Sequence, residues 1–155
     1  MRYIIKQNGL NIGEITTKYQ IDKNMKFFSY EEITFDNYKT IEFKIDTSNK
    51  KYYVNFRSLK DTKSINKTLY IDTCKNFICV PLELCLYMNR EIFNKYKIVL
   101  LDIKTMTYYN LKYRELNNGI QFLSPIRAEV LYKDDEASVI KDIFNEISII
   151  DMKEV

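Results

Sequence analysis

Ser29 and Glu31 are the first side chains to suggest chemistry, because they interrupt an otherwise apolar pattern in the segment MKFFSYEEITF, residues 25–35. In an extended strand the odd positions of this segment share one face, so we expect Phe27, Ser29 and Glu31 to point inward together. A carboxylate buried without a partner is costly and tends to protonate. Glu31 therefore indicates either a polar group in a ligand cavity, paired with a tyrosine or with Arg57, or a bulge or strand edge that turns the carboxylate into solvent.

The absence of histidine from the chain limits the catalysis that it could support. A Ser-His or Cys-His nucleophile pair, a general base poised near neutral pH and a His-bearing metal site all lack their usual residue. The sequence has no GxGxxG and no GxxxxGK[ST] motif to hold nucleotide phosphates. Any catalysis would use carboxylates, tyrosine, lysine or cysteine, with Glu31 as acid or base. We expect no cofactor.

The three cysteines, Cys74, Cys79 and Cys85, have CxxxxC and CxxxxxC spacings. Common zinc sites use pairs two to four residues apart and a fourth ligand, so this spacing argues against a metal site. We expect free, buried thiols in a reducing compartment.

The chain is rich in aromatic residues, with 13 Tyr and 9 Phe but no Trp. Tyrosine and phenylalanine are favoured in strands, which would explain the enrichment structurally. The functional alternative is a cavity whose aromatic walls hold one apolar ligand. Together with the polar residues above, this gives a candidate ligand-binding set: Phe27, Ser29, Glu31, Phe43, Tyr52, Phe56 and Arg57.

The elements that would position these residues are short strands in the first half of the chain. Asn8-Gly9, between two apolar runs, predicts a hairpin with a type I′ turn, and Gly13 predicts a bulge in the second strand. Alternation in TIEFKID and KYYVNFR predicts two further strands in an antiparallel meander. The inward-facing positions that we expect are Met25, Phe27, Ile33 and Phe35, then Ile41, Phe43 and Ile45, then Tyr52, Val54 and Phe56.

The second half of the chain has a different pattern. Pro81 and the apolar residues that follow predict one helix over 81–94. The apolar run 96–103 predicts a strand buried on both faces, and further strands are expected over 107–116 and between 120 and 132. Residues 134–150 fit a second helix with acidic residues at its start, and a strand is the alternative over the same segment.

Length and composition indicate a single α+β domain, 1–155, that is mainly antiparallel β: a curved meander or roll, or an open barrel, with one or two short helices. The formal net charge of +3 and the sequence pI of about 8.6 argue against a nucleic-acid partner. We find no apolar run long enough for a membrane span and no signal peptide, so we expect a cytoplasmic protein.

The order of elements resembles bacterial antiparallel β-roll families similar to lipoprotein carriers. The resemblance rests on the opening hairpin, the long meander, the segment PLELCLYM and the later segment LLDIKTMTYYNLKY. It implies a strongly curved antiparallel sheet wrapped around a helix or an apolar ligand. The chain differs from these families in having no recognisable export signal, and no functional residues are carried over.

Three functions follow from these observations. The first is a non-catalytic binding protein that holds a small hydrophobic or aromatic ligand in a curved β-roll. The second is a phage or mobile-element interaction protein that blocks a host macromolecule, with a protein as its partner. The third is a histidine-free isomerase or cyclase of the barrel type. The absence of a catalytic motif places binding and interaction ahead of catalysis.

Overall fold

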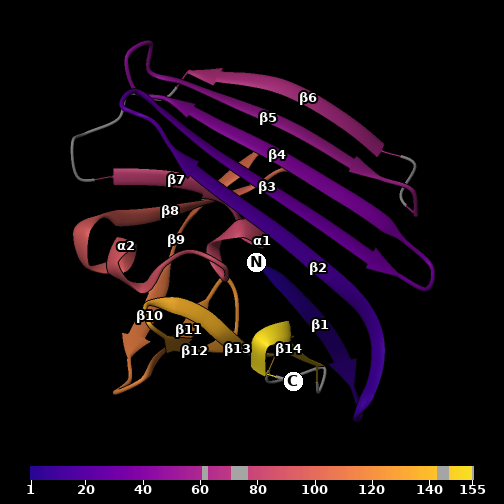
Figure 1. The fold of residues 1–155 in the computed structure, drawn as a ribbon. Helices are drawn as coiled ribbons and strands as arrows, with labels where there is room; N and C mark the ends of the chain where they lie inside the picture. The colour runs from indigo at the N-terminus through magenta and orange to yellow at the C-terminus, as the bar shows by residue number, and fades with distance from the viewer. Residues whose placement is uncertain (61–62, 71–76, 143–146, 155) are drawn as a thin grey trace.

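Eleven strands form one large antiparallel sheet in the computed structural model, which describes residues 1–60, 63–70, 77–142 and 147–154 (Figure 1). The first six strands follow the chain in order: β1 (Arg2–Gln7), β2 (Leu10–Ile21), β3 (Met25–Thr34), β4 (Tyr38–Asp46), β5 (Lys51–Ser58) and β6 (Lys63–Tyr70). The remaining five are β10 (Lys112–Glu115), β11 (Gly119–Ser124), β12 (Ala128–Lys133), β13 (Glu136–Asp142) and β14 (Ile147–Asp151). Each consecutive pair within these two groups is antiparallel, as the meander pattern predicts.

The two groups of strands are joined by the pairing of β1 with β14, which places the ends of the chain side by side in the sheet. Strands β6 and β10 form the two outer edges, and they do not pair with each other. The sheet is therefore open, and Figure 1 shows that it is curved. This confirms the expected mainly antiparallel fold and its open form.

The segment between β6 and β10 supplies an inner layer on the concave side of the sheet (Figure 1). It contains the small sheet β7 (Phe77–Pro81), β8 (Lys97–Asp102) and β9 (Thr107–Asn110), in which β7 and β8 are parallel. It also contains the short helices α1 (Leu82–Cys85) and α2 (Arg90–Lys95); a 3₁₀ turn, η1 (Met152–Glu154), ends the described chain. Four consecutive residues of β8, 98–101, are buried, as the uninterrupted apolar run predicts.

The opening hairpin forms as predicted. Asn8 and Gly9 both have positive φ, 52° and 79°, as a type I′ turn requires. The predicted bulge is also confirmed: Ile5 pairs with Gly13 and Lys6 with Asn11, so Ile12 is the extra residue. A Cβ on Gly13 would lie 2.5 Å from the Ile33 carbonyl oxygen, so the close approach of β3 requires glycine there.

Strand β3 presents the opposite face to the one expected. Phe28 and Tyr30 are buried, whereas Ile33 is 48% and Phe35 99% exposed, so the prediction that the odd positions face inward was wrong. The segment has large apolar residues at both its odd and its even positions, so alternation alone does not show which set faces the core. The choice comes from pairing, because Phe28 lies opposite the fully buried Phe43 of β4.

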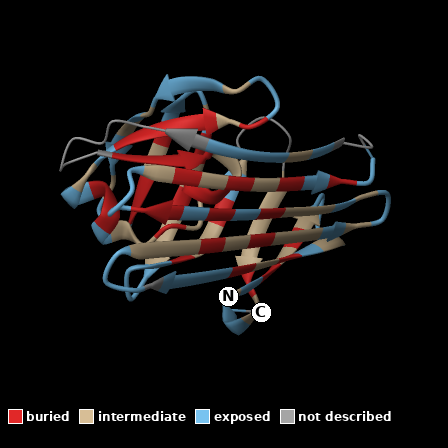
Figure 2. Ribbon diagram, turned by 90° about the horizontal axis from the view of Figure 1, so that it is seen from above, coloured by how far each residue is buried: buried red, intermediate tan, exposed pale blue. Residues whose placement is uncertain are grey.

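Strands β4 and β5 present the expected faces. Three alternate residues of each strand are buried: Ile41, Phe43, Ile45, and Tyr52, Val54, Phe56. Figure 2 shows the resulting bands of buried and exposed residues across the sheet. These side chains pack against the inner layer and form the main core with it.

Two helix predictions need correction. The segment 81–94 forms two short helices, because the chain turns at residues 86–89 instead of continuing one helix. The predicted second helix over 134–150 is wrong, since β13 and β14 occupy its described part and 143–146 lie outside the described residues. The helical spacing of its apolar residues is overridden by strand pairing: β13 pairs with β12, and β14 with β1.

Candidate functional site

The predicted ligand-binding residues separate onto the two faces of the sheet. Three of them, Phe43, Tyr52 and Phe56, are at most 1% exposed and belong to the concave core. Phe43 and Tyr52 pack with ring centroids 5.6 Å apart. The other four, Phe27, Ser29, Glu31 and Arg57, are on the convex face, as the register and burial of β3 and β5 require. The structure therefore does not bring the seven residues into one cavity.

Glu31 lies on the convex face, partly exposed, and its carboxylate accepts a hydrogen bond of 2.8 Å from the Tyr38 hydroxyl. Arg57 is two strands away, with Thr40 between them in the register. A hollow of about 210 Å³ on this face is bordered by Ser29 and Glu31. Glu31 is thus not inside the roll, and this removes the acid or base that a barrel-type isomerase would have used.

The polar groups that do face inward come from neighbouring positions. The Tyr30 hydroxyl donates a short hydrogen bond to the Glu32 carboxylate. Lys39 forms an ion pair with Glu83 of α1, with 3.4 Å between Nζ and Oε1, and both side chains are mostly buried. Burial raises the pKa of Tyr30 well above its usual value. At neutral pH its phenol is therefore protonated, as it must be to donate to Glu32.

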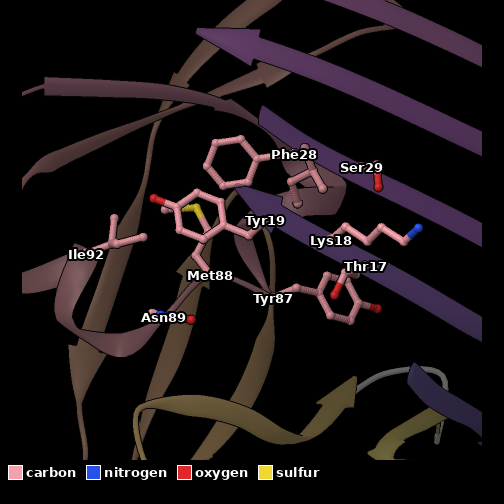
Figure 3. Close-up of a pocket in the computed structure, with 10 residues that line it drawn as sticks. Thr17, Lys18, Tyr19, Phe28, Ser29, Tyr87, Met88, Asn89 and Ile92 are labelled. Atoms are coloured by element: carbon pink, nitrogen blue, oxygen red, sulfur yellow. The ribbon is translucent and has the colours of Figure 1, made fainter. Parts of the chain in front are cut away.

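A pocket opens where β2 and β3 meet the connection between α1 and α2 (Figure 3). Its apolar wall is made by Tyr19, Phe28, Met88 and Ile92, and the Tyr19 and Phe28 rings are 4.5 Å apart. In Figure 3 the Lys18 and Ser29 side chains point away from these aromatic rings. The innermost hollow is small, about 30 Å³, and has room for only a water-sized group.

A wider groove of about 770 Å³ adjoins this hollow. The two share five lining residues, Thr17, Lys18, Tyr19, Tyr87 and Asn89, and the groove also reaches Met1, Gln20, Phe27 and Glu136. Its volume is within the range of about 300–1,000 Å³ that is typical of ligand pockets. The hollow and the groove together are called the β2 groove below.

Tyr19 and Tyr87 give the β2 groove both apolar and polar character. Burial raises the pKa of Tyr19 to about 12, with smaller contributions from Tyr96 and Glu91 of α2. Burial also raises the pKa of Tyr87, and the nearby charge of Glu32 adds to this. Both phenols are therefore neutral near pH 7. They can donate or accept hydrogen bonds while their rings contact an apolar group.

Asn89 and Met88 owe their positions to the break between the two helices. Asn89 precedes α2 but its side chain does not cap the helix, so its amide can hydrogen-bond elsewhere. Met88 is 3% exposed and packs under Tyr19. Its unbranched thioether can adjust to a bound group at low cost.

Sequence reasoning missed these residues for identifiable reasons. Tyr19 lies in the second strand of the predicted hairpin, but the sequence carries no signal that this strand continues beyond its neighbour β1. Tyr87, Met88 and Asn89 were placed inside one helix, where they would have faced in different directions. The dipeptide Met88-Asn89 was the available signal, since asparagine is favoured immediately before a helix.

The described residues contain no group of three or more His, Cys, Asp or Glu side chains placed to hold a metal. Cys79 and Cys85 are free and buried, as predicted, and Cys74 lies outside the described residues. Burial raises the pKa of Cys79 to about 12, so this thiol is a poor nucleophile at neutral pH. Among the described helices, none combines the length and the apolar character that crossing a bilayer requires.

Fold and site together define a protein with a large, open antiparallel sheet, an inner layer made of a three-stranded sheet and two short helices, and a groove at the end of that layer. Comparison with protein-family models, with curated proteins and with solved structures gives no match to this chain.

Proposed function

We propose that the protein is a non-catalytic binding protein that holds a small apolar or aromatic molecule in the β2 groove. The observation that carries this proposal is the size and lining of the groove: about 770 Å³, with three aromatic rings, Tyr19, Phe27 and Tyr87, beside the polar side chains of Thr17, Lys18, Gln20, Asn89 and Glu136. Aromatic side chains next to placed polar groups are typical of sites for small ligands. The sheet interior is not the site, because Phe43 and Phe56 are fully buried there.

A ligand would lie in the wide part of the groove with its apolar part against the Tyr19 ring, under which Met88 packs. Thr17, Tyr87 and Asn89 would orient any polar group that it carries. The groove has no histidine, the residue that most often acts as a general acid or base near neutral pH, because the chain has none. Binding without turnover is therefore the function that this geometry supports best.

Methionine methyl NMR offers a direct test, because the five methionines sample different parts of the molecule. Met1 and Met88 line the β2 groove, whereas Met106 and Met152 do not. With indole as the probe, we expect the Met88 and Met1 methyl resonances to shift in a saturable way while those of Met106 and Met152 stay in place.

Two tyrosine variants provide a matched control for this titration. Tyr19 is 38% and Tyr109, on β9, 39% exposed, so their removal changes a similar exposed surface. Tyr19→Ala should weaken indole binding at least five-fold and Tyr109→Ala should leave it unchanged. Equal effects of the two variants, or no Met88 shift at millimolar indole, would refute the proposal.

A further inference from the structure

Strand β2 is longer than the strand that pairs with it on one side. On the β3 side, β2 is paired as far as Ile21, opposite Lys26. On the β1 side, the register ends with Thr16 opposite Arg2, followed by bonds between Thr17 and Met1. In the part of the chain that the structure describes, β2 has no strand beside residues 18–21 on that side.

The backbone groups that face this gap follow from the antiparallel pattern. Thr17 and Met1 exchange two hydrogen bonds, of 2.8 Å from the Thr17 N–H and 2.7 Å to the Thr17 carbonyl. Backbone groups along a strand point alternately to its two sides, so the N–H and carbonyl of Tyr19 face the same side as those of Thr17. The amides of Lys18 and Gln20 face β3 instead. Tyr19 therefore presents one donor and one acceptor to the gap.

The β2 groove runs beside this gap, because residues 17–20 all line it. An edge with unpaired backbone groups is a template for another strand, and an extended peptide can add to it through main-chain hydrogen bonds. Side-chain pockets beside such an edge then select the residues of the peptide. The β2 groove offers both features in one place.

We propose that the ligand of the β2 groove is an extended peptide that adds as a strand to Tyr19 of β2, in line with β1 and antiparallel to β2. This inference rests on the proposed function and names its ligand class. The peptide residue opposite Tyr19 exchanges two hydrogen bonds with it, as Met1 does with Thr17. Its side chain then points to the concave side, toward Tyr87 and Met88.

The neighbouring groups define the sequence that the peptide should have. The position opposite Tyr19 favours an aromatic or other apolar side chain, because the Tyr19 and Tyr87 rings line the groove there and Met88 packs under Tyr19. The next position lies opposite the exposed Lys18, and an acidic residue there forms a cross-strand pair of opposite charge. The tripeptide acetyl-Ser-Phe-Glu-amide places Phe opposite Tyr19 and Glu opposite Lys18.

The experiment compares this peptide with the same peptide carrying an N-methyl group on the Phe nitrogen. Methylation removes the donor that would bond the Tyr19 carbonyl, but it keeps the side chains. We expect the unmethylated peptide to shift the Met88 methyl resonance and to slow hydrogen exchange of the Tyr19 amide. The methylated peptide should bind at least ten-fold more weakly. Lys18→Glu should weaken binding of the Glu peptide, and acetyl-Ser-Phe-Lys-amide should restore it.

Failure of this inference can be told from failure of the proposed function. If indole shifts Met88 but the two peptides bind equally or not at all, strand addition is refuted while small-molecule binding stands. If neither indole nor the peptides shift Met88, both are refuted. Concentration-dependent protection of the Tyr19 amide without peptide would show that a second copy fills the edge, which also overturns the peptide assignment.

Discussion

The concave and convex faces of strands β2–β5 share one backbone, but their side chains differ in burial and in polarity. The concave face meets the inner layer, and its central residues, such as Phe43, are fully buried. The convex face carries alternate residues that meet solvent, such as Glu42 and Lys44. The concave face is filled, and the convex face carries two separate hollows, of about 390 and 210 Å³, that are smaller than the β2 groove. The β2 groove forms where the inner layer ends and the sheet continues beyond it.

The contrast also shows that two charged side chains on the concave face, Glu32 and Lys39, each have a hydrogen-bond or ion-pair partner. Glu32 faces the concave side and is met by Tyr30, and Lys39 is met by Glu83. Glu31, one residue from Glu32, faces the other side and bonds Tyr38 near solvent. A shift of one residue thus decides whether a carboxylate belongs to the interior or to the surface.

The largest expected difference between the faces is in the cost of removing a phenylalanine. Phe43→Ala should lower the free energy of unfolding by about 3–5 kcal/mol, because it leaves a cavity in a filled core. Phe35→Ala removes the same side chain from the bend after β3, at a position that is 99% exposed, and it should change stability by less than about 0.5 kcal/mol. Urea unfolding measures both, and similar values would contradict the assignment of Phe43 to the filled concave core.

The Lys39–Glu83 pair tests the polar part of the concave face. Lys39→Met removes the cation and leaves the Glu83 carboxylate in a mostly buried position, where its Oε2 atom has no hydrogen-bond partner among the described residues. We expect a loss of about 2 kcal/mol, below the ~3–5 kcal/mol of a fully buried pair. The double variant Lys39→Met with Glu83→Gln should recover part of this loss. If the double variant is less stable than Lys39→Met alone, the unpaired charge of the Glu83 carboxylate does not cause the loss of stability.

The amino-acid pattern predicted the parts of this fold in which local and long-range signals agree. The hairpin at Asn8-Gly9 and the faces of β4 and β5 are such cases, because turn chemistry and alternation are sufficient there. The pattern failed where both the odd and the even positions of a strand carry apolar residues, as at Phe27 and Phe28. There only the pairing of Phe28 with Phe43 decides which face is buried. The β2 groove could not be predicted from the sequence for a related reason. Its position depends on where β1 ends beside β2, and this is set by the register of the two strands.

Alkaline pH should reveal the buried tyrosines of the concave face. Burial raises the pKa of Tyr52 to about 12, whereas tyrosine in an unfolded chain ionises near pH 10. Between these values the folded protein retains a proton that the unfolded chain has lost, so the free energy of unfolding falls as pH rises. Tyr52→Phe should make this fall shallower. Urea titrations at several pH values would measure it, and an unchanged slope in the variant would contradict the burial of the phenol.

The smallest effects are expected for two polar residues of the convex face, Glu31 and Arg57. Both meet solvent, and Glu31 bonds a partly exposed tyrosine, so Glu31→Gln and Arg57→Gln should each change the free energy of unfolding by less than about 0.5 kcal/mol. Neither residue lines the β2 groove, so indole binding should also be unchanged. Tyr19→Ala, measured beside them, should weaken binding while these two variants do not. A loss of binding in Glu31→Gln with an intact fold would move the site to the convex face, where Glu31 borders a hollow of about 210 Å³.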